Sequence, residues 1–249
     1  MITIKNMYTS PQMVRLALIG MRNPMNSWER GVDTYVNEDF INICKNDIKL
    51  MRQLCKAGPE HRKYLRQIPI VLTINAPLYW WKEFDTYKIG TTANSCSTMH
   101  KLMSKPITMD DFSFDGIGNN HKVFLQMIVD RCESIRIGYV NETNDERKKE
   151  LFRLLIQTMP CGYNQERTVT MNYENVLNMI HQRKNHKLSE WRTLVDIFKD
   201  QLPIVELLTM SDENFNGMLE NMPGKHSVIR VNCKIKESVL NNKKEMEEN

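Results

Sequence analysis

Two kinds of spacing between apolar residues occur in the first half of the chain. In segment 39–57 the apolar residues recur three or four positions apart, which is the period of one helix face. They are Ile41, Cys44, Ile48, Met51 and Leu54. Segments 13–20 and 68–75 are instead short runs of mostly apolar residues, and such runs are typical of buried strands. The pattern therefore predicts strands at 13–20 and 68–75 and a helix over 39–57.

Proline, loop-forming residues and helix-capping asparagines indicate where the next elements begin and end. Segment 77–84 opens with proline, which suits the first position of a helix. Segment 88–118 is rich in Thr, Ser, Asn, Asp and Gly, and we expect a loop with short elements there. Asn119 or Asn120 can cap a helix over residues 121–135.

Helical signals become stronger toward the C-terminus. Asn144 can cap a charged helix that runs through Met159 and stops at the following proline. A short alternating segment at 166–171 looks like a strand, and helices are expected over residues 172–183 and 188–200. These elements together predict a mixed α/β (α+β) fold.

The length and composition are those of a globular domain. The chain has 249 residues, of which 41% are hydrophobic and 26% are charged. It shows neither a repeat nor a linker, so we predict a single domain over residues 1–240 and a polar, frayed tail over 241–249. The formal net charge of +4 is small for this length, and it does not indicate specific nucleic-acid binding.

The first residues do not contain the apolar segment of a secretory signal. The longest apolar stretch, residues 68–81, is too short and too polar to cross a bilayer. The six cysteines form no CxxC pair and are expected to be reduced. We therefore predict a soluble cytoplasmic protein without a membrane partner.

Several familiar kinds of site are excluded by their motifs. The chain has only 10 glycines and contains neither GxGxxG nor GxxxxGK[ST], so a nucleotide would have to bind without a glycine-rich phosphate loop. The histidines and cysteines do not have the spacing of a metal site, and none is predicted. There is no GxSxG motif, and Cys96 in its polar loop fits an ordinary thiol better than a nucleophile.

The predicted helix over 172–183 carries an arginine on its apolar side. Arg183 shares a face with Val176, Met179 and Ile180, so its guanidinium should point toward the core or the edge of a cleft. An arginine cannot lose its charge there and needs an anionic or carbonyl partner. The alternative is a solvated arginine that the helix dipole favours at a C-terminus. A polar stripe lies next to this face and consists of Asn175, Asn178 and Gln182. Its side chains could form hydrogen bonds with a ligand.

The segment 78–88 contains five aromatic residues together with Lys82 and Lys88. Aromatic rings between lysines can stack on bases. A helix of this composition more often supplies core and oligomer contacts, and we favour that interpretation.

The order of elements around this helix resembles one known family. Met159-Pro160 precedes the predicted strand, and Asn172, Asn178 and Arg183 follow it on one helix. The arrangement is similar to that of the flavin-dependent thymidylate synthases, the ThyX family. There, a helix ending in leucine-proline leads through a strand to a helix with two asparagines and the catalytic arginine.

Residues 68–102 add a second stretch of resemblance. A strand and an aromatic-rich helix precede the loop where the family carries its signature RHRxxSxNExSxR. In one register Lys88 lies over a signature arginine, and a shift by one residue aligns Asn94 and Ser97 with the signature's asparagine and serine. Lys88 is the one residue that keeps a positive charge at a signature arginine, and Glu174 stands where the family has another arginine.

The resemblance implies a ThyX-like fold, with a central, mainly antiparallel sheet flanked by helices. It also implies a homotetramer that binds FAD and a pyrimidine nucleotide. The implied reaction is reductive methylation of dUMP to dTMP, with NADPH and methylenetetrahydrofolate as co-substrates.

The resemblance also implies roles for individual residues. Arg183 would be catalytic and lie beside the pyrimidine. The residues that would bind the cofactor are His61, Lys88, Asn172 and Asn178. The residues that would line the nucleotide side, with Arg183, are Lys82 or Glu83, Asn94, Cys96 and Ser97.

Two alternatives remain open at this stage. One is a divergent flavin enzyme that modifies another pyrimidine nucleotide, for example by hydroxymethylation. The other is a ThyX-like protein that has lost catalysis and serves as a nucleotide-binding or assembly protein.

Overall fold

The computed structural model describes residues 2–26, 28, 33–97, 101–114, 116, 118–224 and 226–236. The predicted polar tail at 241–249 lies outside these residues. No helix in the described ranges is long and apolar enough to span a membrane.

The chain divides into two compact units. The first consists of Met1–Thr3, Thr73–Thr86 and Ala93–Thr168, and the second of Ile4–Leu72, Tyr87–Thr92 and Val169–Asn249. Four of the five points where the chain passes from one unit to the other fall inside strands, namely β1 (Thr3–Tyr8), β4 (Pro69–Pro77), β5 (Thr92–Ser95) and β6 (Asn164–Asn172). The extent of a single domain over 1–240 therefore stays a prediction.

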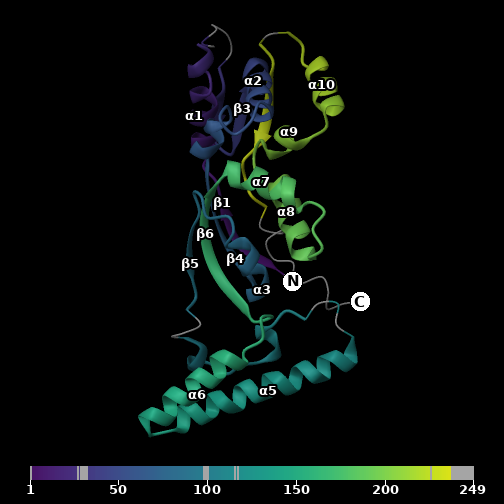
Figure 1. Cartoon of the computed structure of the whole chain (residues 1–249). Coiled ribbons are helices and arrows are strands. Elements are labelled where there is room, and N and C mark those ends of the chain that lie inside the picture. The colour runs from purple at the N-terminus through teal and green to yellow at the C-terminus, as the bar shows by residue number, and fades with distance from the viewer. Residues whose placement is uncertain are drawn as a thin grey trace. The chain divides into compact units, whose positions relative to one another are not determined.

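The second unit combines a small sheet with several helices. Its main elements are β1 (Thr3–Tyr8), α1 (Pro11–Gly20), β2 (Tyr35–Asn37), β3 (Phe40–Cys44), α2 (Lys45–Lys56), the 3-10 helix η2 (Lys63–Gln67), α7 (Tyr173–Arg183), α8 (Ser189–Gln201), α9 (Val205–Thr209), α10 (Asp212–Glu220) and β7 (Val228–Asn232) (Figure 1). Strand β3 is central and pairs antiparallel with β2 and β7, with Ile41 opposite both Val36 and Val231. Ile41 and Ile43 are fully buried on one face of β3, and Asn42 and Cys44 are also buried on the other, so both faces of this central strand are covered.

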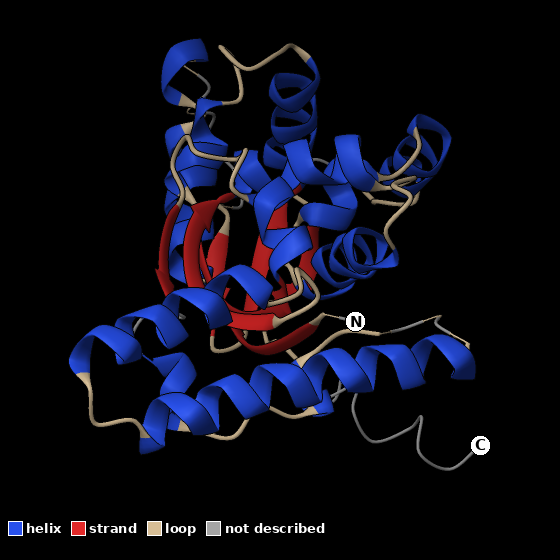
Figure 2. Ribbon diagram, turned by 60° about the horizontal axis from the view of Figure 1, so that its bottom comes forward, coloured by secondary structure: helices blue, strands red, loops and turns tan. Residues whose placement is uncertain are grey.

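The first unit contains α3 (Leu78–Phe84), β5 (Thr92–Ser95), α5 (Asn119–Asn141) and α6 (Asp145–Thr158). Helices α5 and α6 lie side by side in both ribbon views (Figures 1 and 2). Together with side chains from segment 102–112 and residue 163, they form one hydrophobic cluster, whose buried members are Leu102, Ile107, Phe112, Val129, Cys132, Ile135, Leu155 and Tyr163.

A larger sheet has four strands in the order β1-β4-β6-β5. Strand β4 alternates buried and half-buried residues along most of its length, and Ile70, Leu72 and Ile74 are buried. The predicted fold class, a mixed α/β fold with antiparallel sheets and flanking helices, is confirmed.

A buried ion pair joins the end of α1 to the start of α2. Arg22 donates from Nε and Nη2 to the two carboxylate oxygens of Asp47, at 2.8 and 2.6 Å. Its Nη2 also donates to the exposed Asp33 at 2.7 Å, and the buried Thr34 hydroxyl donates to Asp47 at 2.5 Å. The hydrogen bonds that Arg22 donates to Asp47 raise the pKa of Arg22 further above its usual value, so the guanidinium stays charged.

Two element predictions from the sequence are corrected. The strand predicted at 13–20 is wrong, because the residues form α1, whose N-terminus is capped by the Ser10 side chain and opens with Pro11. The helix predicted over 39–57 begins only at Lys45, because Phe40–Cys44 pairs with β7 nearly 190 residues later, for example Asn42 opposite Arg230. Such distant pairing leaves no local signal.

Most of the later elements agree with their predictions. Asn144 caps α6, and its side chain accepts a hydrogen bond from the backbone of Arg147 at 3.0 Å. The helix predicted over 121–135 is longer than expected, because α5 runs over Asn119–Asn141 and its cap residue is Gly118.

Candidate functional site

Helix α7 positions three of the predicted site residues, and its own sequence explains where it begins. Asn172 caps the helix by accepting a hydrogen bond from the backbone of Asn175 at 3.2 Å, and Asn175 Oδ1 accepts one from the backbone N–H of Asn172 at 3.3 Å. This reciprocal pair satisfies backbone donors that the first turn would otherwise leave unpaired. Asn172 therefore has a structural role, and its cofactor-binding role stays a prediction.

The segment Tyr87–Thr92 lies against α7. The Asn175 side chain donates to the carbonyl oxygen of Ile89 at 2.9 Å. Gly90 has a φ of +71°, and a Cβ at this position would lie 2.7 Å from Asn172 Nδ2. The close approach requires glycine. Lys88, which was predicted to bind the cofactor, lies in the same segment and is exposed.

Replacing Gly90 by alanine should destabilise the second unit through this close approach. A positive φ alone costs alanine about 1–2 kcal/mol, and the contact with Asn172 should add about 1–3 kcal/mol of overpacking. Gly116→Ala is a matched control, because its φ is +72° and a Cβ there meets no atom of the described residues within 4 Å. Chemical denaturation should show the larger loss for Gly90→Ala; equal losses would contradict the packing argument.

Arg183 ends α7 and is half-buried against aromatic rings. Its Nε donates to the Tyr87 hydroxyl at 3.0 Å, and that hydroxyl donates to Gln182 Oε1 at 2.8 Å. The guanidinium carbon lies 4.6 Å from the centre of the Trp191 ring and 5.6 Å from that of Tyr87. Aromatic faces attract a cation, so the side chain is held in one place with its charge intact.

A second cluster on α7 was not found from the sequence. Glu174 accepts a hydrogen bond from Arg62 Nε at 3.2 Å and is also bound by Arg66. Arg62 Nη2 donates in turn to the predicted cofactor residue Asn178 at 3.0 Å. The arginines lie more than 100 residues before Glu174, so only the fold brings them together. Glu174 occupies a position where an arginine was expected, and here two arginines from another segment surround it.

The charge of Glu174 is stabilised by these contacts. Burial by itself would raise the pKa of this carboxyl, but the hydrogen bonds from Arg66 and Arg62 outweigh burial and hold the pKa below its usual value. The carboxylate therefore remains charged at neutral pH.

The Glu174 cluster should make the stability of the second unit depend on pH. Because the folded-state pKa is lowered, the stabilisation is present above about pH 4.3, the usual pKa of glutamate, and is lost as the pH falls through the lower folded value. Thermal unfolding should show Glu174→Gln less stable than the wild type near neutral pH, with the difference shrinking in more acidic buffer. Glu150→Gln, in an exposed ion pair, should show little difference at any pH. A constant difference for Glu174→Gln would contradict this account.

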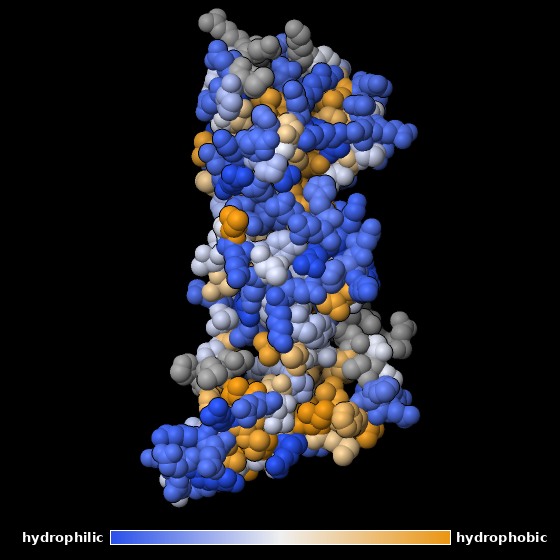
Figure 3. Space-filling model, in the orientation of Figure 1, coloured by the Kyte–Doolittle hydropathy of each residue, from blue (hydrophilic) through white to orange (hydrophobic). Residues whose placement is uncertain are grey.

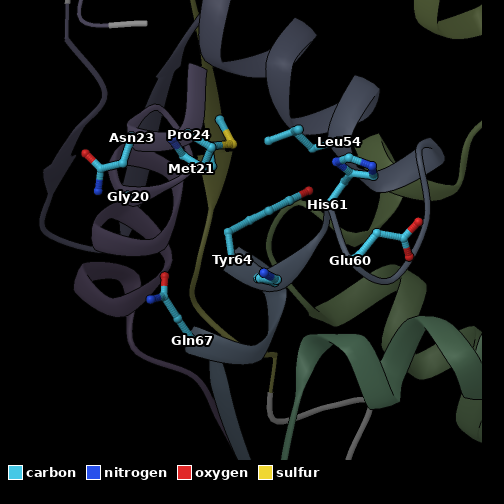
Figure 4. Close-up of a pocket in the computed structure, with 10 residues that line it drawn as sticks. Gly20, Met21, Asn23, Pro24, Leu54, Glu60, His61, Tyr64 and Gln67 are labelled. Atoms are coloured by element: carbon cyan, nitrogen blue, oxygen red, sulfur yellow. The ribbon is translucent and has the colours of Figure 1, made fainter. Parts of the chain in front are cut away.

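His61 lines a pocket of about 620 Å³ in the second unit (Figure 4). Figure 4 shows His61 and Leu54 on one side and Asn23, from the segment after α1, on the other. The complete lining is Gly20, Met21, Asn23, Pro24, Leu54, Glu60, His61, Lys63, Tyr64 and Gln67. Buried apolar side chains with a few polar groups at the edge are typical of small-molecule sites.

Apart from Arg183, the residues predicted on the nucleotide side belong to the first unit. Lys82 on α3 is exposed and its Nζ lies 3.3 Å from Cys161 Sγ, while the neighbouring Glu83 is half-buried. Asn94 is exposed on β5, and Ser97 is half-buried just beyond the strand.

Both backbone polar groups of Cys96 are hydrogen-bonded to residues of β6. Its N–H donates to Glu166 O at 2.9 Å, and its carbonyl accepts from Gln165 Nε2 at 2.7 Å. The thiol-bearing residue is exposed. Among the described residues, no three His, Cys, Asp or Glu side chains are arranged to hold a metal ion.

The fold is similar to that of three solved structures. Flavin-dependent thymidylate synthase ThyX from Helicobacter pylori, complexed with FAD and dUMP, has a TM-score of 0.56 and 17% sequence identity, over 86% of this chain and 96% of that chain. A second structure of the H. pylori enzyme with FAD and dUMP has a TM-score of 0.57 and 17% identity, over 84% and 100%. UMP/dUMP methylase PolB from Streptomyces cacaoi, bound with 5-Br dUMP, has a TM-score of 0.51 and 11% identity, over 80% and 88%.

These similarities establish a ThyX-like fold for the chain. No family model matches the sequence, and no curated protein matches it by sequence.

Proposed function

We propose that this protein is a flavin-dependent enzyme that modifies a pyrimidine nucleotide, and that its reaction is the reductive methylation of dUMP to dTMP. FAD would be the cofactor, with NADPH and methylenetetrahydrofolate as co-substrates. The observation that carries the proposal is the placement of Arg183, charged and held between Tyr87 and Trp191 at the end of α7, in a chain with a ThyX-like fold.

The described residues of the second unit fit a flavin cofactor in three respects. The pocket beside His61 has an apolar floor that includes Met21 and Tyr64 and a volume suited to part of a large planar ligand. The Thr91 hydroxyl is buried and has no hydrogen-bond partner within the described residues, so a ligand could provide one. The two positive charges of Arg62 and Arg66 are only partly balanced by the single negative charge of Glu174. The cluster therefore carries a net positive charge, which favours binding of an anion.

Bound FAD would supply a reducible ring for hydride and one-carbon transfer. His61, Lys88, Asn172 and Asn178 are the residues proposed to bind it. Arg183 is proposed to favour the anionic, nucleophilic form of the pyrimidine, because a fixed positive charge in a partly dry site stabilises developing negative charge. Tyr87 and Trp191 keep the guanidinium in position and exclude water from one of its faces.

The nucleotide is proposed to contact Lys82 or Glu83, Asn94, Cys96 and Ser97. These side chains offer donors and acceptors for a base and a charge for a phosphate. The assembly is proposed to be a cytoplasmic homotetramer.

The visible spectrum of the purified protein tests the proposal. Oxidised flavin absorbs visible light, so the protein should be yellow or become yellow when FAD is added and unbound FAD is removed. His61→Ala should retain less flavin than Glu150→Ala, a variant in an exposed ion pair on α6. A colourless protein that takes up no FAD would refute the flavin enzyme and would favour the non-catalytic binding or assembly protein.

A divergent enzyme acting on another pyrimidine nucleotide is the second candidate. Glu174 in place of an arginine favours it, because a reversed charge changes which anionic group can bind. The fold similarity to a UMP/dUMP methylase is compatible with such a change. Product analysis by mass spectrometry with dUMP, UMP and dCMP as competing substrates distinguishes methyl from hydroxymethyl transfer and identifies the preferred nucleotide.

A further inference from the structure

The strand that leads into the predicted nucleotide-side residues lies at the edge of the larger sheet. In the strand order β1-β4-β6-β5, β5 comes last and its neighbour is β6. All four residues of β5 are exposed, and Figure 3, drawn in the orientation of Figure 1, shows mainly hydrophilic residues around this strand. Burial of apolar surface therefore contributes little to holding β5 and the adjoining Cys96 and Ser97 in place.

Polar contacts connect this segment to β6. The buried side chain of Gln165 donates from Nε2 to the carbonyl oxygen of Cys96 at 2.7 Å. The backbone N–H of Cys96 donates to the carbonyl oxygen of Glu166 at 2.9 Å. The first of these bonds depends on a side chain, so a substitution can remove it while the backbone groups of the second bond remain.

Arg167 determines which way the Gln165 amide points. Its Nε donates to Gln165 Oε1 at 3.0 Å. A guanidinium can only donate and a carbonyl oxygen can only accept, so the amide must present Oε1 to Arg167 and Nε2 to Cys96. In the reverse orientation, two donors would face each other at one end of the amide and two acceptors at the other.

Arg167 is itself held from two further sides. Its Nη1 donates to Asp85 Oδ1 at 2.7 Å, and its guanidinium carbon lies 4.4 Å from the centre of the Trp81 ring. Trp81 is buried, and its Nε1 donates to the carbonyl oxygen of Gln165 at 2.9 Å. These contacts lie within the first unit and connect Asp85 to Cys96 through two intervening side chains.

We propose that Gln165 and Arg167 are positioning residues for the nucleotide site. They fix the backbone of Cys96, and through it the neighbouring Asn94 and Ser97, whose side chains are proposed to contact the nucleotide. The inference rests on the proposed function for the identity of this ligand. An exposed edge strand that is already held in place loses less conformational entropy when a ligand binds to it. The two residues thus raise the affinity for the nucleotide through the strand and not by direct contact.

Hydrogen exchange resolved at Cys96 tests whether the amide holds the strand. Gln165→Glu keeps the size of the side chain and still accepts from Arg167, but a carboxylate has no hydrogen to donate to the Cys96 carbonyl. The backbone amide of Cys96 should therefore exchange about tenfold faster in this variant than in the wild type. Gln126→Glu is the matched control and should leave the rate unchanged, because it removes an amide bond to Asp130 from an exposed side chain in the same unit.

The same experiment separates a local effect from a general loss of stability. Val129 and Cys132 belong to α5 and to the buried cluster of the first unit. Their amides should exchange at the wild-type rate in Gln165→Glu. An equal increase at these amides and at Cys96 would indicate general destabilisation and would overturn the positioning role. An unchanged rate at Cys96 would overturn it as well.

A double substitution tests whether Arg167 acts through Gln165. Arg167→Met should accelerate exchange at Cys96, because the Gln165 amide is then free to turn. Gln165→Leu removes the amide, so combining it with Arg167→Met should give the same rate at Cys96 as Gln165→Leu alone. Independent effects that add in the double variant would overturn the role of Arg167.

Binding of dUMP tests the link to the nucleotide. Calorimetric titration of the protein supplied with FAD should give a Kd about tenfold higher for Gln165→Glu than for the wild type or Gln126→Glu. Flavin absorbance should not change, because the residues proposed to bind FAD lie in the second unit. Equal affinities in Gln165→Glu and the wild type would overturn this inference alone. A wild type that binds no dUMP would overturn the proposed reaction on dUMP, and this inference with it.

Discussion

Replacing Arg183 by alanine should reduce product formation from dUMP, reduced cofactor and methylenetetrahydrofolate by at least about a hundredfold. The guanidinium is the fixed positive charge that the proposed mechanism places beside the pyrimidine, and Tyr87 and Trp191 hold it in position. The turnover number should fall while the flavin spectrum remains, because Arg183 is not among the residues proposed to bind the cofactor. Steady-state kinetics and absorbance on the same preparation measure both quantities.

Two further variants make this result specific. Lys184→Ala removes the next positive charge along the chain, from an exposed side chain, and should leave turnover unchanged. Arg183→Lys keeps a charge but loses the planar group that stacks on Trp191, so its activity should lie between those of the wild type and Arg183→Ala. Unchanged turnover in Arg183→Ala, or an equal loss in Lys184→Ala, would refute the assigned role.

The largest loss of stability is expected for Asp47→Ala. This change leaves the buried guanidinium of Arg22 without its main partner, and removing one member of a buried pair costs about 3–5 kcal/mol. The Thr34 hydroxyl donates to the same carboxylate and accepts from the backbone N–H of Cys44, so the loss is not confined to one bond. Urea denaturation followed by circular dichroism measures the change in the free energy of unfolding.

The exposed partner of Arg22 provides the control. Asp33 contacts the same guanidinium but is largely open to solvent, so Asp33→Ala should cost less than about 1 kcal/mol. Replacing both buried members, as Arg22→Met with Asp47→Leu, should recover much of the stability lost in Asp47→Ala, because no unpaired buried charge remains. Equal effects of Asp33→Ala and Asp47→Ala would contradict the burial argument.

The later helices were predicted well because capping residues at their N-termini mark in the sequence where each helix begins. Asn144 and Asn172 each cap a helix with their side chains, and both are visible in the sequence. The same logic would have identified α1 correctly, since Ser10 and Pro11 are a start signal and Val14, Ala17 and Leu18 have helical spacing. Strand β3 could not be found in this way, because its partner β7 lies at the far end of the chain.

In the candidate site, too, features set by neighbouring residues could be predicted, whereas contacts between distant segments could not. The position of Arg183 on its helix follows from spacing within α7 alone. The contact of Glu174 with Arg62 and Arg66 depends on two segments that only the fold brings together. Sequence comparison with the family gave Glu174 as a missing positive charge, whereas the structure surrounds this position with two positive charges from elsewhere.

The contact between Arg183 and Trp191 makes the candidate site observable by intrinsic fluorescence. Of the four tryptophans, Trp80 and Trp81 are buried in the first unit and Trp28 is exposed, while Trp191 lies directly under the guanidinium. The emission of an indole ring changes when a neighbouring cation moves or is neutralised. A ligand that draws Arg183 toward its own charge will therefore report its binding through Trp191, without an added dye and before any turnover occurs.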